Sequence, residues 1–134
     1  LKVGMNVAVA TPDGYKPDGA VLEFTKGCGD KFALETDPFM AASGADILIT
    51  DTWTSMGEEA EKEERKKIFK DYQINRQLLA AANAGAMVQH CLPAYRGQEI
   101  TEEVFEEHAD EIFNEAENRL HAQKAVMVKL MKKD

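Results

Sequence analysis

The sequence lacks any apolar run near the roughly 20 residues that a membrane-spanning helix needs. It also lacks the basic start and apolar stretch of a signal peptide. Its two cysteines, Cys28 and Cys91, lie far apart and form no C-x-x-C pair, so we expect neither a disulfide framework nor a zinc site. Only 16 basic residues stand against 24 acidic ones, which argues against nucleic-acid binding. These shortages predict a globular protein of the reducing cytoplasm.

The sequence does contain an alternation of short apolar runs and helical patterns. With 44% hydrophobic and 30% charged residues, its 134 residues fit one domain, 1–134. The predicted strands are 6–10, 31–35, 45–50 and 86–89. The predicted helices are 20–26, 38–43, 58–70, 75–83, a short one from about 101, and 115–132. This order predicts an α/β fold with a doubly wound, Rossmann-like parallel sheet, flanking helices and a long C-terminal helix.

The first four residues, LKVG, have the pattern of a last helical turn closed by a glycine. They run directly into the first predicted strand, whereas a sheet of this class normally has a strand and a helix before that point. We therefore expect the chain to begin inside a βαβ unit, with one strand of the usual sheet missing.

The stretch DTWTSMG follows the apolar strand at 45–50, which we expect to be buried. Ser55 with Glu58 forms a capping box, which is sufficient to explain the start of the charged helix EEAEKEERKK. Asp51 needs a partner if it is desolvated behind that strand, and Trp53 beside it can form a pocket wall. A carboxylate next to the free N–H groups of a helix start suits a zwitterionic ligand. The capping and binding explanations are compatible.

The strand at 86–89 leads into His90-Cys91-Leu92-Pro93. Adjacent side chains on an extended strand point to opposite faces, so we expect no metal shared by His90 and Cys91. Cys91 can equally be a small buried hydrophobic residue. Pro93 can end the strand and allows a cis peptide bond.

The final predicted helix carries an arginine near its expected start. Asn114 can cap that helix with Glu117 at the third helical position. Arg119 would then lie close to the helix N-terminus, where it is either solvated or able to reach a carbonyl or an anion. His108 and His121 are expected at the surface.

These motifs resemble one family over nearly the whole chain. D-x-W-x-S-M-G occupies 51–57, H-C-L-P occupies 90–93, and E-A-E-N-R-L-H-A-Q-K-A occupies 115–125. Together with ATPDGYKPD and KDYQIN, they are similar to the second, amino-acid-binding domain of ornithine carbamoyltransferases. The S-M-G turn favours ornithine over aspartate, because aspartate carbamoyltransferases carry a more basic segment there and H-P-L-P in place of H-C-L-P.

The resemblance implies transfer of the carbamoyl group of carbamoyl phosphate to the δ-amine of L-ornithine, giving citrulline and phosphate. Asp51 would bind the α-ammonium of ornithine, and Ser55 with the Met56 backbone would hold its amino-acid end. Cys91 would lie beside the reacting amine, and Arg119 would polarise the carbamoyl oxygen. The carbonyls of Cys91 and Leu92 would orient the carbamoyl NH2 across a cis Leu92-Pro93 bond. The residues with supporting roles would be Trp53, Gly57, His90 and Pro93.

The resemblance also implies the setting of the reaction. It implies no metal or organic cofactor and no membrane or nucleic-acid partner. The complete enzyme would be a homotrimer in the cytoplasm, or in the mitochondrial matrix of a eukaryote. It would serve arginine biosynthesis or the arginine deiminase pathway.

Several motifs of the family are not found. These are the phosphate-binding S-T-R-T-R motif, the H-P-x-Q element, and the G-D-G-N-N strand that would lie centrally between 6–10 and 45–50. We therefore expect this chain to be inactive without an N-terminal carbamoyl-phosphate domain, in the same or a separate chain.

Three other functions fit parts of the pattern. ADILITDTWTSMG is also similar to the phosphoacceptor strand of a signalling receiver domain, although the acidic pair and the lysine of such domains do not appear at the expected strand ends. A non-catalytic amino-acid-binding module would retain Asp51 and the S-M-G turn. A carbamoyltransferase acting on another amine is the nearest enzymatic alternative.

Overall fold

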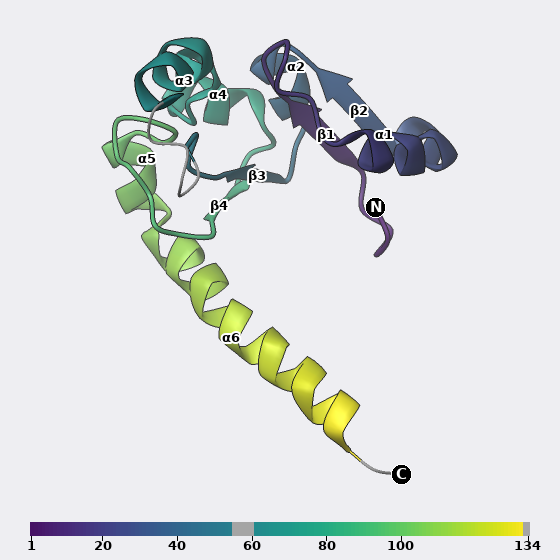
Figure 1. Cartoon of the computed structure of the whole chain (residues 1–134). Coiled ribbons are helices and arrows are strands. Elements are labelled where there is room, and N and C mark those ends of the chain that lie inside the picture. Colours follow the sequence, from purple (N-terminus) through teal and green to yellow (C-terminus); the bar gives the residue numbers. More distant parts are fainter. Residues whose placement is uncertain (55–60, 133–134) are drawn as a thin grey trace.

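The computed structural model describes residues 1–54 and 61–132, and within them all four predicted strands are found. Strand β1 (Val7–Ala10) pairs in parallel with β2 (Phe32–Glu35), and β3 (Ile47–Thr50) pairs in parallel with β4 (Met87–His90). Helices join and flank the strands (Figure 1). The predicted α/β class with parallel pairing is therefore confirmed.

The strands form two sheets of two strands each rather than one continuous sheet. Among residues 1–54 and 61–132, no strand pairs with the second edge of β1 or of β3. This agrees with the expectation that a strand between them is missing. The expectation that 45–50 is fully buried was wrong, because Ile49 in β3 is 66% exposed. Only one face of β3, carrying Leu48, is packed on a core.

Four of the short helices begin where a side chain satisfies a free N–H group. Asp18, Asp37, Asn75 and Thr101 each accept a hydrogen bond from the first turn of the helix that follows, as expected of such caps. The helices are α1 (Gly19–Thr25), α2 (Pro38–Ala42), α3 (Lys62–Phe69), α4 (Arg76–Ala81) and α5 (Glu102–Glu107), with 3-10 turns η1 (Lys26–Lys31) and η3 (Lys70–Tyr72).

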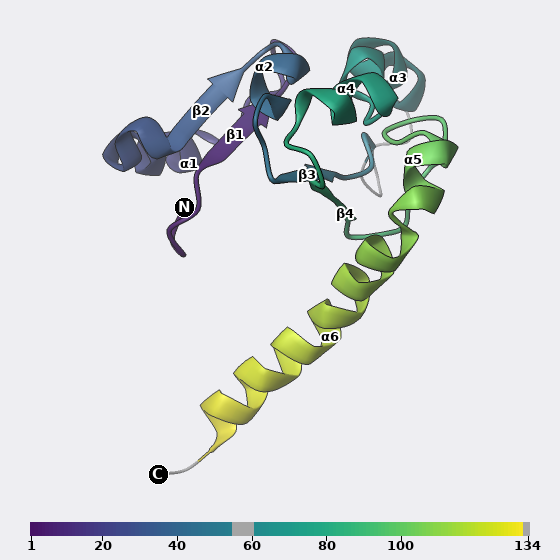
Figure 2. The same cartoon turned by 180° about the vertical axis from the view of Figure 1, so that it is seen from behind.

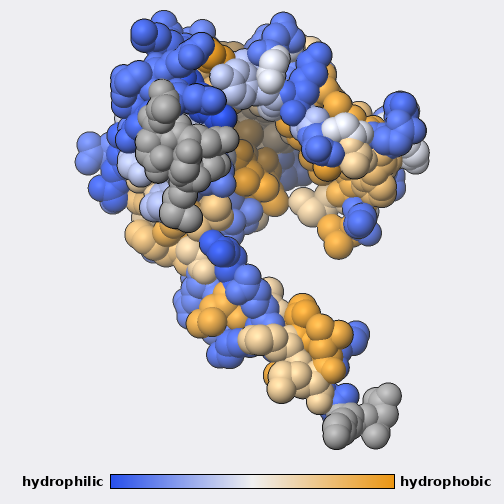
Figure 3. Space-filling view, viewed as in Figure 1, coloured by the Kyte–Doolittle hydropathy of each residue, from blue (hydrophilic) through white to orange (hydrophobic). Residues whose placement is uncertain are grey.

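The last helix, α6 (Ala109–Met131), starts earlier than predicted. Asn114 lies inside it and caps nothing, so the predicted start at 115 was wrong. The cause is tertiary, since Ile112 in the extra first turns is fully buried in the core. The outer part of α6 extends away from the sheets and exposes apolar residues such as Val128 and Leu130 (Figures 2 and 3). No described helix, α6 included, is both long and apolar enough to cross a membrane.

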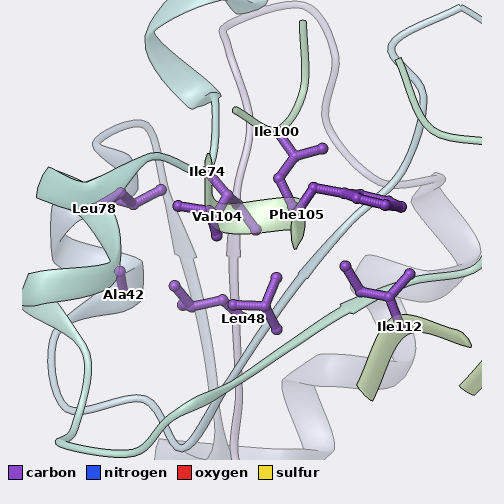
Figure 4. Packing of buried hydrophobic residues seen from close by; sticks show 9 residues of the cluster. Ala42, Leu48, Ile74, Leu78, Ile100, Val104, Phe105 and Ile112 are labelled. Atoms are coloured by element: carbon purple, nitrogen blue, oxygen red, sulfur yellow. The ribbon is translucent and has the colours of Figure 1, made fainter. Parts of the chain in front are cut away.

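The core lies around β3 and β4, beneath α4, α5 and the start of α6 (Figure 4). Its fully buried members include Val88, Ile100, Val104 and Ile112. The other members of this cluster are Ala42, Leu48, Ile74, Leu78 and Phe105. Among the members of this cluster, Ala42, from α2, is the one on the β1–β2 side, so the core packs mainly against β3 and β4.

One carboxylate fastens α6 to β4. Glu111 accepts a hydrogen bond from the backbone N–H of Val88, at 2.8 Å, and one from the Nδ1 of His108, at 2.9 Å. Burial raises the pKa of Glu111, but the hydrogen bonds from His108 and Val88, together with the charge of His108, outweigh burial and leave the pKa below its usual value. His108 is therefore a half-buried partner of Glu111 and not the surface residue expected.

We predict that Glu111→Gln lowers the free energy of unfolding by about 1 kcal/mol at neutral pH, because the Val88 N–H and His108 lose a charged acceptor. Folding lowers the pKa of Glu111 from about 4.5, so the carboxylate stabilises the fold above that value, and the contribution is lost as the pH falls through the lower folded pKa. The stability difference between wild type and variant should therefore shrink in acid.

Urea denaturation at pH 7 and pH 3 measures this. Glu117→Gln is the matched control, because Glu117 is exposed and its hydrogen bond is to His121 on the same helix. Equal losses in the two variants would contradict the role given to Glu111.

Candidate functional site

The carboxyl ends of β3 and β4 bring two of the predicted motifs together. The strands pair with Thr50 opposite His90, so Asp51 and Cys91 follow side by side. A carboxylate oxygen of Asp51, a ring nitrogen of His90 and the Sγ of Cys91 all lie within 4.8 Å of one another. The expectation that His90 and Cys91 point to opposite faces fails because β4 ends at His90, and Cys91 no longer follows the pleat.

Asp51 is exposed, which corrects the expectation that it is desolvated behind a buried strand. One of its oxygens accepts a hydrogen bond from the backbone N–H of Thr52, at 2.7 Å. The carboxylate also hydrogen-bonds the thiol of Cys91. It is thus oriented by the turn while remaining open to a ligand from solvent.

Cys91 is held in its thiol form. Its pKa is raised first by burial and then by the hydrogen bond and negative charge of Asp51. The charge of Glu115 adds to this effect, and Arg119 opposes it. A thiol with a raised pKa is a weak nucleophile near neutral pH, so Cys91 is suited to contact a ligand rather than attack it.

Arg119 joins the same group from α6. Its guanidinium donates a hydrogen bond to the backbone carbonyl of Cys91, at 3.4 Å. This confirms that Arg119 can reach a carbonyl, although it does so from the middle of α6 and not from the helix start. The carboxylate, thiol and guanidinium therefore gather at one edge of the β3–β4 sheet.

A buried pair beneath these groups shapes the turn that follows β4. His90 and Glu99 are both fully buried, and His90 Nε2 lies 3.1 Å from Glu99 Oε1. His90 Nδ1 accepts the N–H of Leu92, at 3.0 Å, so Nε2 carries the proton and donates to Glu99. Glu99 also accepts the N–H of Tyr95. The pair thus binds the turn at both ends.

That turn has an unusual backbone, with the cis bond that Pro93 allows and the family resemblance implies. The Leu92-Pro93 peptide bond is cis, and Leu92 has a φ of 57°, in the left-handed region that favours glycine. Leu92 packs against the core, and its N–H is held by His90. Glu99 was not anticipated from the sequence. The signal that could have found it is a histidine in an apolar strand, which needs a polar partner when buried.

A metal ion would find an incomplete set of ligands here. Asp51, His90 and Cys91 are close enough to share one. However, both ring nitrogens of His90 already take part in hydrogen bonds, and the raised pKa of Cys91 disfavours the thiolate that binds metals. The geometry therefore suits an organic ligand better than a metal ion.

Part of the predicted site falls outside the described residues. Ser55, Met56 and Gly57 belong to this part. Trp53 is half-buried, and its ring stacks on Phe69 of α3 with centroids 6.1 Å apart. Its role as a pocket wall stays a prediction.

The family model for the aspartate/ornithine carbamoyltransferase Asp/Orn-binding domain matches residues 1–130. The chain therefore belongs to the aspartate/ornithine carbamoyltransferase family. It is 56% identical, over 134 residues, to an ornithine carbamoyltransferase of Gloeobacter violaceus, with 97% of this chain and 43% of the relative covered.

Two solved structures have the same fold. The anabolic ornithine carbamoyltransferase of Campylobacter jejuni superimposes with a TM-score of 0.86 at 45% identity, covering 92% of this chain and 42% of that one. The ornithine carbamoyltransferase of Gloeobacter violaceus gives a TM-score of 0.84 at 50% identity, covering 98% and 44%. The chain thus spans less than half the length of these relatives.

We predict that Asp51→Asn speeds alkylation of Cys91 severalfold at neutral pH. Removing the carboxylate charge lowers the pKa of the thiol and raises the fraction of reactive thiolate. Iodoacetamide labelling from pH 7 to pH 10, followed by mass spectrometry of the two cysteine peptides, measures both rates.

Cys28 serves as the internal reference in this experiment. It lies in η1, on the β1–β2 side of the molecule, where its Sγ contacts the Phe24 carbonyl. Its rate should be the same in both proteins. An unchanged or slower Cys91 rate in Asp51→Asn would show that the carboxylate does not control this thiol.

Proposed function

We propose that the chain is the ornithine-binding part of a carbamoyltransferase that transfers the carbamoyl group of carbamoyl phosphate to the δ-amine of L-ornithine. The products are citrulline and phosphate. The observation that carries this proposal is the grouping of Asp51, Cys91 and Arg119 at the ends of β3 and β4 in a member of this family. Because the chain belongs to this family, we set aside the alternative of a signalling receiver domain.

Each group has a role in this proposal that its chemistry supports. The exposed carboxylate of Asp51 binds the α-ammonium of ornithine, assisted by Ser55 and the Met56 backbone. The neutral Cys91 thiol lies beside the δ-amine, and its raised pKa keeps it from competing for the carbamoyl carbon. The nucleophile is the substrate's own amine, so catalysis consists mainly of orientation and charge stabilisation.

Arg119 stabilises the charge that develops on the carbamoyl oxygen. It carries a permanent positive charge and already donates to the Cys91 carbonyl. The carbonyls of Cys91 and Leu92 accept hydrogen bonds from the carbamoyl NH2. His90 and Pro93 support them by fixing the turn between β4 and Tyr95.

The chain supplies one half of the site in this proposal. The carbamoyl-phosphate half belongs to another part of the enzyme, in the same or a separate polypeptide. That part also provides the strand that pairs with β1 on one side and β3 on the other, since both edges are open among the described residues. Residues 1–134 are then an ornithine-binding domain that is incomplete at its N-terminus.

The wider setting follows from the same family. We propose a homotrimer in the cytoplasm, or in the mitochondrial matrix of a eukaryote. It would act in arginine biosynthesis or in the arginine deiminase pathway, and the relative from Campylobacter jejuni is named as anabolic.

The proposal is tested by joining the chain to the part of the Gloeobacter violaceus relative that it does not match. We predict that the joined protein makes citrulline and that the chain alone does not. Asp51→Asn should raise the KM for ornithine about 100-fold, the effect of losing a charged hydrogen bond. Arg119→Gln should lower kcat about 100-fold with little change in either KM, as expected of an oxyanion-type donor.

Arg76→Gln is the matched control for these substitutions. Arg76 binds Glu103 and Glu107 of α5, away from the strand ends, and both kinetic constants should stay at wild-type values. A joined protein that folds and assembles but makes no citrulline would contradict the proposed reaction. Robust activity of the chain alone would contradict the need for a second part.

A further inference from the structure

The helix α3 contacts all three loops that follow strands at the proposed site. Arg65 of α3 lies over the ring of Tyr15, in the loop after β1, with 5.4 Å between its Cζ and the ring centroid. The same guanidinium donates to the carbonyl of Trp53, at 3.3 Å, in the turn after β3. Lys62, one turn away, lies 5.1 Å from the centroid of Tyr95, in the loop after β4.

Aromatic rings complete the contact between α3 and these loops. Phe69 meets Tyr15 edge to face, with centroids 4.9 Å apart, and stacks on Trp53, with centroids 6.1 Å apart. It also contacts Tyr72, whose hydroxyl donates to the Thr36 carbonyl after β2, at 2.6 Å. Helix α3 therefore contacts both the turn that carries Asp51 and the loop after β1.

We propose that Arg65 is a positioning residue that fixes the Asp51–Trp53 turn for binding of the amino-acid substrate. Its Nε donates to Glu61, at 3.0 Å, while another nitrogen donates to Trp53, and the side chain is only 18% exposed. A planar guanidinium can hold a carboxylate, a carbonyl and an aromatic face at once, which a lysine ammonium cannot do with the same geometry. The identity of the substrate in this inference rests on the proposed function. The positioning role of Arg65 rests only on the contacts described above.

The geometry explains why this residue affects the site without touching it. Trp53 is two residues from Asp51, and Asp51 itself holds the Thr52 N–H. Releasing the Trp53 carbonyl frees the far end of this short turn, so the Asp51 carboxylate loses its orientation while the β3–β4 pairing stays intact. Substrate binding should therefore suffer more than folding.

The first measurement needs only the chain itself. Trp53 is the single tryptophan, so its fluorescence reports this turn alone. In Arg65→Lys and Arg65→Gln, acrylamide should quench Trp53 about twofold more strongly, because the hydrogen bond that holds this turn is lost. Unchanged quenching and emission in variants with wild-type circular dichroism would overturn the positioning role.

Arg96→Lys is the matched control. Arg96 also lies over an aromatic ring, that of Phe105, at 4.5 Å, and pairs with Glu106, at 2.6 Å, but it does not contact the Asp51 turn. The substitution removes the same kinds of contact elsewhere in the fold. Trp53 quenching should stay at the wild-type value in this control, and an equal rise there would overturn the assignment to Arg65.

The second measurement uses the joined enzyme. Arg65→Lys should raise the KM for ornithine about tenfold, less than the loss of the Asp51 charge, because the turn loses its hydrogen bond to the guanidinium while the Asp51 carboxylate remains. The KM for carbamoyl phosphate should stay unchanged. A wild-type ornithine KM in this variant, with an active parent enzyme, would overturn the inference and leave the proposed function standing. If the parent makes no citrulline, the proposed function fails, and the quenching experiment still decides whether Arg65 positions the turn.

Discussion

The parallel pairing of β3 with β4 is the constraint on which the site depends. With Thr50 opposite His90, the two strands end together and release Asp51 and Cys91 next to each other. A shift of one residue in this register would turn Asp51 or Cys91 to the other side. The register is held by Leu48 and Val88 in the core and by the Glu111 carboxylate on the Val88 N–H. Stability of this small sheet is thus inseparable from the geometry of the site.

The polar side chains at the ends of β3 and β4 form a buried layer and an exposed layer. His90 and Glu99 form the buried layer, where a neutral imidazole and a carboxylate hold the backbone of the turn after β4. Asp51 and Arg119 form the exposed layer; Asp51 interacts with the Cys91 thiol, and Arg119 donates to the Cys91 carbonyl. A negative and a positive group that both contact Cys91 suit a ligand that carries both an ammonium group and a polar carbonyl.

Features encoded locally could be predicted from the sequence. The four strands and the helices that begin near 38 and 101 follow from short patterns of residues, and Pro93 allows the cis bond that the structure contains. The start of α6 could not be predicted this way, because Asn114 is a plausible cap and only the packing of Ile112 extends the helix past it. Long-range partners were missed for the same reason. Nothing in the short-range pattern connects His90 to Glu99 or Arg65 to Trp53.

The solvent exposure of Asp51 was also misjudged, because a run of apolar residues does not reveal whether both faces of a strand are covered. We propose that this exposed carboxylate binds the amino-acid substrate beside Cys91. A crystal structure of the joined enzyme with L-ornithine would show whether it does. We expect the α-ammonium of ornithine about 3 Å from the Asp51 carboxylate, the ordinary hydrogen-bond distance, with the δ-amine next to the Cys91 thiol. Ornithine bound elsewhere, or reversed with its δ-amine on Asp51, would contradict it.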